Sequence, residues 1–186
     1  VHSYSFQYCV GPYPEGDALT DLFIHPLDLI QFLFPKGKIE SIQIAQHTTS
    51  LSVFLHIRHG DIIGNVELST DYFWQQAKEQ MHINTSSGLF QSTNCESLSF
   101  TKKPGVLLSI PKEKLFPFRP QTITLFQKNS FLPVLQQNEL YAAGYFSEIE
   151  QFIKLCEGHK AFNQSQLLDI KPTFEMLEEL KSRVNQ

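Results

Sequence analysis

The chain has 186 residues, of which 41 % are hydrophobic and sixteen are phenylalanine, so it is long and apolar enough to form one sizeable folded domain. Fifteen basic residues against nineteen acidic ones give a net charge of −4, with no basic cluster beyond Lys102-Lys103. This balance argues against nucleic acid as a partner. The longest apolar run, residues 18–34, is too short and too charged to span a bilayer, so we expect no membrane partner.

The cysteines indicate the compartment. Cys9, Cys95 and Cys156 are an odd number without regular spacing, which favours free thiols in a reducing cytoplasm over a disulfide framework. The chain opens Val1-His2-Ser3, with neither an initiating Met nor a signal peptide. We therefore expect a fragment of a cytoplasmic protein.

The first predicted elements are a strand and a helix. Residues 2–10 alternate between apolar and polar side chains, and Gly11-Pro12 ends that strand. The apolar run over 18–34 predicts a helix that Pro35-Lys36-Gly37 ends. Pro26 should either kink this helix or begin its regular part.

Hairpins follow the helix. Period-two patterns predict strands over 39–46, 51–57, 62–68, 80–84, 89–93 and 97–100. The sequence His59-Gly60-Asp61 supplies one hairpin turn, because glycine adopts positive φ at little cost. Consecutive hairpins predict a mostly antiparallel sheet.

The last third of the chain predicts a connection and two helices. Residues 101–137 are rich in proline, with short strands expected near 107–108 and 122–125. One helix is expected from a cap at Asn138 to Gly158, with Leu140 and Ala143 on its apolar stripe. The other is expected from Ser165 to Leu180, with Phe174 buried and a kink or break at Pro172.

Together these elements predict an α+β fold, a large, mostly antiparallel, open-faced sheet with helices on one face. The sheet has more apolar positions than three helices cover. We therefore expect the open face to be apolar and to mediate self-association, as a homodimer or tetramer.

Three polar residues interrupt the apolar run at helical spacing. Asp21, His25 and Asp28 fall at i, i+4 and i+7, which places them on one face of a helix. A histidine oriented by an aspartate is suited to taking a hydroxyl proton near neutral pH. A helix-starting aspartate and a hydrogen-bonded core histidine would explain the same pattern, so spacing alone leaves both interpretations open.

Other patterns are less specific. Trp74, in Tyr72-Phe73-Trp74, could line a sugar-binding cleft or cover the sheet. His56 and His59 point to opposite faces of a strand, so we expect no metal site. Carboxylates as close in sequence as Glu15, Asp17 and Asp21 rarely face each other across a substrate, which argues against a glycosidase.

The motif and the order of elements resemble the C-terminal domain of the glucose-fructose oxidoreductase and inositol dehydrogenase (Gfo/Idh/MocA) family. The matching motif residues are Gly16, Asp21, His25 and Asp28, with Asp17 where the family has a second glycine. The later hairpins, Gly144-Tyr145-Phe146 and the two closing helices follow in the family's order. The resemblance implies a dihydrodipicolinate-reductase-like domain over residues 1–186 for substrate binding and oligomerisation, with the N-terminal Rossmann domain absent from this chain.

The resemblance also implies an activity. The parent protein would be a NAD(P)-dependent oxidoreductase acting on a sugar, polyol or related hydroxy compound. His25 would be the acid/base, Asp21 would orient it, and Asp28 and Trp74 would contact substrate. No Gly-x-Gly-x-x-Gly loop is present, so we expect the cofactor, NAD or NADP, to be bound mainly by the absent domain, with none bound by this fragment, which alone would be inactive. The alternative is a non-catalytic binding or assembly module that retains the same fold.

Overall fold

The computed structural model describes residues 1–117, 119–129, 144–159 and 168–184. The chain divides into two compact units, Val1–Gln127 with Pro172–Gln186, and Lys128–Lys171. The first unit contains the sheet and its core.

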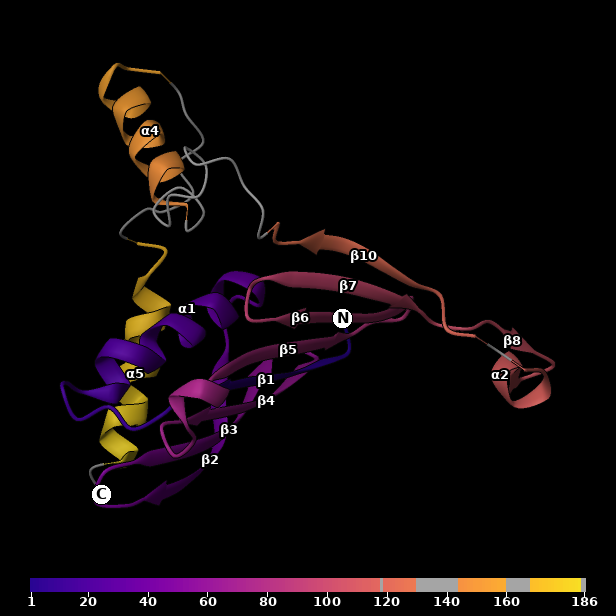
Figure 1. Cartoon of the computed structure of the whole chain (residues 1–186), viewed down its shortest axis with the longest axis horizontal. Coiled ribbons are helices and arrows are strands. Elements are labelled where there is room, and N and C mark those ends of the chain that lie inside the picture. Colours follow the sequence, from indigo (N-terminus) through magenta and orange to yellow (C-terminus); the bar gives the residue numbers. More distant parts are fainter. Residues whose placement is uncertain (118, 130–143, 160–167, 185–186) are drawn as a thin grey trace. The chain divides into compact units, whose positions relative to one another are not determined.

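The first unit is built on one eight-stranded sheet, shown in Figure 1. Its strands are β1 (Ser3–Cys9), β2 (Lys38–Gln46), β3 (Leu51–His59), β4 (Ile62–Ser69), β5 (Lys78–Asn84), β6 (Gly88–Thr93), β7 (Ser97–Lys102) and β10 (Thr122–Gln127). Their order across the sheet is β10-β7-β6-β5-β1-β4-β3-β2. β1 and β4 are parallel, and all other neighbours pair antiparallel. The predicted mostly antiparallel sheet is therefore confirmed.

Two helices bury one face of this sheet. The helix α1 (Ile24–Leu33) contributes Leu27 and Ile30 to the core, and α5 (Lys171–Val184) contributes Leu177 and Leu180. These four side chains are at most 1 % exposed, and burial of each contributes about 1.5–3 kcal/mol. On the sheet they join alternate residues of the central strands, among them Tyr4, Phe6, Leu55 and Val66. The α+β class is confirmed, with helices on the core face.

The opposite face of the sheet is polar, which corrects the expectation of an apolar surface. Strand pairing aligns one residue from each of the eight strands in a hydrophilic row on this face. The row is Ser41, His56, Asn65, Ser5, His82, Gln91, Ser99 and Thr124. Strict alternation sends the apolar residues to the core face, so the uncovered face keeps few, such as Phe54 and Ile63.

The first helix begins irregularly. A π-helical turn, η1 (Leu19–Phe23), leads directly into α1, and Pro26 is buried in the first turn of α1. Proline is tolerated there because the first helical N–H groups have no partner within the helix. Pro26 thus begins the regular part of the helix, which is one of the two outcomes expected.

The closing helices start later than the sequence predicts. α4 (Tyr145–Cys156), in the second unit, follows Gly144, whose φ of 89° suits glycine. α5 starts at Lys171 with Pro172 in its first turn, so the helix is broken before Pro172, which is one of the two outcomes expected there. The predicted burial of Phe174 is wrong, because this residue is exposed. The predicted positions Asn138, Leu140, Ala143 and Ser165 lie outside the described residues.

Short elements fill the remaining connections. η2 (Trp74–Gln76) lies between β4 and β5, while β8 (Val106–Leu107), β9 (Ile110–Pro111) and α2 (Lys112–Leu115) lie between β7 and β10. Among the described helices, none has both the length and the apolar character needed to cross a membrane.

His59, at the end of β3, is a buried polar residue in this core. Its Nε2 lies 2.8 Å from the Tyr4 hydroxyl, and its ring is next to those of Tyr4 and Phe34. Nδ1 is buried and makes no hydrogen bond within the described part of the chain. Burial lowers the pKa of His59, and the backbone at Phe34 and Pro35 opposes this effect only in part.

We therefore expect acid to destabilise the domain through His59. Because the pKa is lower in the folded state, the unfolded chain takes up the proton first, so the free energy of unfolding falls as the pH drops below about 6.5. The fall should not exceed about 1.4 kcal/mol per pH unit for this one group. Urea titrations between pH 8 and 5 should show a weaker pH dependence for His59→Gln. The exposed control His47→Gln should behave as the wild type, and equal slopes for all three proteins would contradict this assignment.

Candidate active site

The three motif residues lie together on the solvent side of η1 and α1. Asp21, His25 and Asp28 are all exposed, whereas the opposite side of the same helical segment is buried through Phe23 and Leu27. The predicted common face is therefore confirmed. A core histidine, which was the alternative explanation, is excluded for His25 by its exposure.

Asp21 is bound to the loop that precedes it. Its Oδ2 accepts a hydrogen bond from the Asp17 backbone N–H at 3.0 Å. A Cβ atom on Gly16 would lie only 2.2 Å from the same oxygen, so a larger residue here would force the carboxylate to shift. No hydrogen bond or ion pair joins Asp21 to His25 among the described side chains. Asp21 thus ties the preceding loop to the first turn of η1.

Asp17 helps to start the helix, a role that the sequence analysis missed. Its Oδ1 accepts the Leu19 backbone N–H at 3.1 Å, and the Thr20 hydroxyl donates to its other oxygen. These bonds satisfy a backbone donor that a helix start leaves without a partner. The signal in the sequence is an aspartate placed just before the apolar run.

Asp28 connects the two helices of the core face. Its Oδ1 accepts a hydrogen bond from the Thr173 hydroxyl of α5 at 2.8 Å, and Thr173 is fully buried. The other oxygen, Oδ2, has no hydrogen-bond partner in the described part of the chain. One oxygen therefore fixes the carboxylate while the other is available to solvent or a ligand.

Trp74 packs on the loop between β1 and η1. Its Nε1 donates to the Pro12 carbonyl at 3.0 Å, and a Cβ on Gly11 would lie 2.4 Å from the indole Cδ1. The indole is about half exposed. Trp74 therefore supports the loop that leads to the motif, and part of its ring remains open to solvent.

Tyr13 belongs to the loop on which Trp74 packs, and the sequence analysis did not identify it as a site residue. A Cβ on Gly16 would lie 2.8 Å from its ring, on the same side as the Asp21 carboxylate. Partial desolvation, and then the nearby Asp21 and Glu15 carboxylates, raise the pKa of Tyr13. Its hydroxyl therefore stays protonated as a hydrogen-bond donor. No spacing rule marks Tyr13, because the contact depends on how the loop folds.

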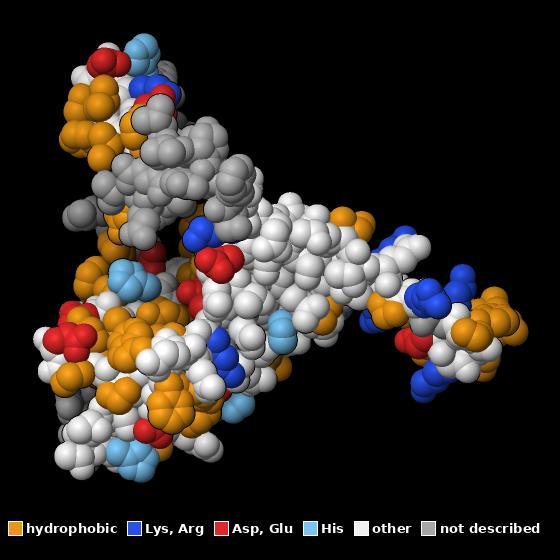
Figure 2. All heavy atoms as spheres, viewed as in Figure 1, with side chains coloured by type: hydrophobic (Ala, Val, Ile, Leu, Met, Phe, Trp, Pro, Cys, Tyr) orange, Lys and Arg blue, Asp and Glu red, His pale blue; other side chains and the backbone are white. Residues whose placement is uncertain are grey.

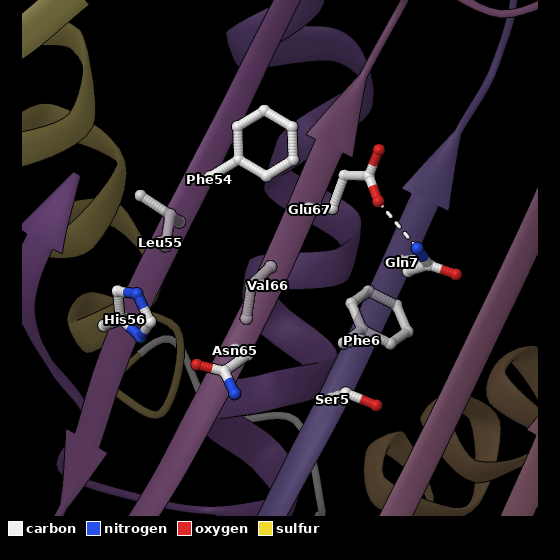
Figure 3. A pocket seen from close by; sticks show the side chains of 9 residues that line it. All are labelled: Ser5, Phe6, Gln7, Phe54, Leu55, His56, Asn65, Val66 and Glu67. Carbon is white, nitrogen blue, oxygen red and sulfur yellow. Dashed lines mark hydrogen bonds between the residues drawn. The ribbon is translucent and has the colours of Figure 1, made fainter. Parts of the chain in front are cut away.

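A polar hollow lies on the open face of the sheet, away from the motif. It has a volume of about 450 Å³ and is lined by β1, β3 and β4, with the Gln7 amide donating to Glu67 at 2.6 Å (Figure 3). His56, Asn65 and Phe54 also line it. It shares no residue with the motif, since the side chains of the two lie on opposite sides of the sheet.

No protein-family model matches this sequence, and no curated protein matches it. Solved structures share its fold. A dehydrogenase (MviM) from Clostridium difficile aligns with a TM-score of 0.68 and 14 % identity over 97 % of this chain and 54 % of its own. UDP-N-acetylglucosamine 3-dehydrogenase GnnA from Acidithiobacillus ferrooxidans aligns with a TM-score of 0.62 and 15 % identity over 95 % of this chain and 53 % of its own.

A levoglucosan dehydrogenase in complex with NADH and L-sorbose aligns with a TM-score of 0.65 and 13 % identity, over 97 % of this chain and 56 % of its own. The chain thus spans about half the length of each of these three structures. At these identities the likeness concerns the fold. The α+β sheet domain expected from the sequence is therefore a fold that these dehydrogenases contain.

The packing of the only tryptophan on Gly11 gives a direct test of the loop. Gly11→Ala should push the indole off the Pro12 carbonyl, because the added methyl would overlap the ring. We expect a red-shifted Trp74 emission and faster acrylamide quenching. Gly105→Ala is the matched control, since its Cβ would meet no atom closer than 3.6 Å. An emission spectrum of Gly11→Ala identical to that of the control would show that the indole does not lie on this loop.

Proposed function

We propose that this chain is the C-terminal substrate-binding and oligomerisation domain of a NAD(P)-dependent oxidoreductase of the Gfo/Idh/MocA type. The reaction is hydride transfer to or from a sugar, a polyol or a related hydroxy compound. The observation that carries this proposal is His25, which is exposed on a helix whose other side is anchored in the core. The fold likeness to dehydrogenases named for UDP-N-acetylglucosamine and levoglucosan supports the substrate class.

His25 moves the proton in this proposal. When a substrate alcohol is oxidised, its carbon loses a hydride and the imidazole accepts the hydroxyl proton, so that a carbonyl forms. In the reverse direction the imidazolium returns the proton to the oxygen. An imidazole open to solvent is suited to this exchange because histidine is the side chain that most often acts as a general acid or base.

The neighbouring groups position the imidazole and the substrate. Asp21 uses Oδ2 to hold the loop, which leaves Oδ1 to stabilise the imidazolium one helical turn away. Asp28, held by Thr173, offers its free oxygen to a substrate hydroxyl. The exposed part of the Trp74 ring offers an apolar surface of the kind on which sugar rings stack.

The loop at the motif does not fit the pyrophosphate of a dinucleotide. The space beside Gly11 and Gly16 is filled by the Trp74 indole and the Asp21 carboxylate, and Glu15 and Asp17 add negative charge. We therefore assign NAD or NADP to a separate dinucleotide-binding domain, and the bound cofactor would accept or donate the hydride.

Assembly and location are further parts of the proposal. We assign self-association to the open sheet face, which presents hydrogen-bonding groups and the exposed rings of Phe54 and His56. We place the protein in the cytoplasm, because its three cysteines are free, with Cys95 and Cys156 exposed.

The first experiment measures NAD(P)-dependent turnover of the full-length protein against a panel of sugars and polyols. His25→Ala should lower kcat by about 10²–10⁴-fold, since it removes the proton acceptor. Asp21→Asn should lower kcat and alter its pH profile, whereas Asp28→Asn should act mainly on KM.

The control is His47→Ala, an exposed histidine in the β2–β3 turn, which should leave both constants unchanged. Circular dichroism and urea titration confirm that each variant is folded. Undiminished turnover in folded His25→Ala would contradict the proposal. Absence of any NAD(P)-dependent turnover would favour a non-catalytic module with this fold.

A further inference from the structure

Residues 102–119, which we call the basic arm, are inserted between the neighbouring strands β7 and β10. The arm consists of β8, β9 and the short helix α2. Several large apolar side chains on it are exposed, including Val106 at 61 %, Leu108 at 90 % and Phe116 at 59 %. The side chains buried in the core come from other elements, so the described part of the chain leaves these apolar side chains of the arm uncovered.

The basic arm also concentrates positive charge. It contains Lys102, Lys103, Lys112, Lys114 and Arg119 against the single acid Glu113, a net charge of +4. Since the whole chain carries −4, the remaining residues carry −8. Figure 2 shows blue and orange side chains gathered together over β8 and α2.

The turn between β8 and β9 presents an apolar tip. Leu108 and Ser109 have φ of 50° and 64°, a left-handed conformation that glycine or asparagine adopts more readily. A leucine there costs about 1–2 kcal/mol relative to the ordinary conformation. Its almost complete exposure means that this cost is offset by no contact within the described residues.

The N-terminal part of the chain has the complementary surface. Residues 1–35 contain Glu15, Asp17, Asp21 and Asp28 and not one Lys or Arg. All four acidic residues are exposed. Phe32, which lies on α1 together with Asp28, is 70 % exposed. An acidic surface with an adjacent apolar ring fits a basic arm with an apolar tip.

We propose that the basic arm docks on the acidic N-terminal surface of a second copy of this chain, and that the second copy returns the same contact. A reciprocal exchange of this kind closes with twofold symmetry and buries both arms. The charge complementarity of arm and body within one sequence favours a second copy over an unrelated partner. This interface is separate from the open sheet face. It includes Asp21 and Asp28 of the candidate active site, so the docked arm would lie beside His25.

Sedimentation velocity of the purified protein at 50 and 500 mM NaCl tests the proposal. Leu108→Asn removes the apolar tip and suits the left-handed backbone better than leucine, so it should fold normally and still weaken self-association at least about tenfold. Lys114→Glu should do the same, and salt should weaken the wild type, since exposed charges are screened. Glu15→Lys should also weaken self-association, because it reverses a charge on the acidic N-terminal surface that receives the arm.

The matched controls are Phe73→Asn and Lys36→Glu, exposed residues of similar kind outside the arm, which should leave the association unchanged. Phe54→Asp, on the open sheet face, separates this contact from the other proposed interface. A monomeric wild type, or an association that withstands Leu108→Asn and Lys114→Glu, would overturn the proposal. Glu15→Lys without effect would overturn the assigned receiving surface, and co-sedimentation with phosphatidylserine vesicles that the arm variants lose would assign the arm to a membrane instead.

Discussion

The packing of one side of η1 and α1 against the sheet is the interaction on which the arrangement of this domain depends. Phe23, Leu27 and Ile30 are completely buried against the central strands. A helix rotated by a third of a turn would expose these side chains and lose several kcal/mol of apolar burial. The orientation of α1 is therefore fixed, and the opposite side, with His25, faces solvent. The core thus decides which side chains of this helix face solvent.

The second helix and the entry loop then fix the details of this surface. Thr173 from α5 reaches across to Asp28, so two segments far apart in sequence hold one carboxylate. Asp17 and Asp21 form hydrogen bonds within the loop at the start of the helix. Closer to β1, the Trp74 indole donates a hydrogen bond to the Pro12 carbonyl of the same loop. These polar contacts contribute about 1 kcal/mol each, far less than the core, but they determine where the side chains point.

Much of this fold follows from periodicity in the sequence. The strand alternation is strict, so β1 to β7 are found close to their predicted limits, and the common face of Asp21, His25 and Asp28 follows from helical spacing. The open face was mispredicted because counting apolar residues does not show that strand pairing aligns polar ones on the same side. Phe174 was mispredicted because the buried stripe of α5 consists of Thr173, Met176, Leu177 and Leu180, which leaves Phe174 facing outward.

The candidate site was less accessible to sequence reasoning than the fold. Its motif is local and therefore visible, but the contacts of Asp28 with Thr173 and of Tyr13 with Gly16 depend on tertiary packing and loop conformation. The net charge of the whole chain, −4, does not reveal how its charges are distributed. Counting charges segment by segment shows a basic arm and an acidic N-terminal part.

The most direct measurement is the reactivity of individual histidines toward diethylpyrocarbonate, followed by peptide mass spectrometry on the folded protein without cofactor or substrate. His25 should react at the rate of the exposed His47, while the buried His59 reacts at least about tenfold more slowly because the protein must open locally first. Addition of NADH and a bound sugar should slow His25 alone. A His25 that reacts as slowly as His59 in the free protein would show that this side of α1 is not open, and would contradict the proton-transfer role proposed for His25.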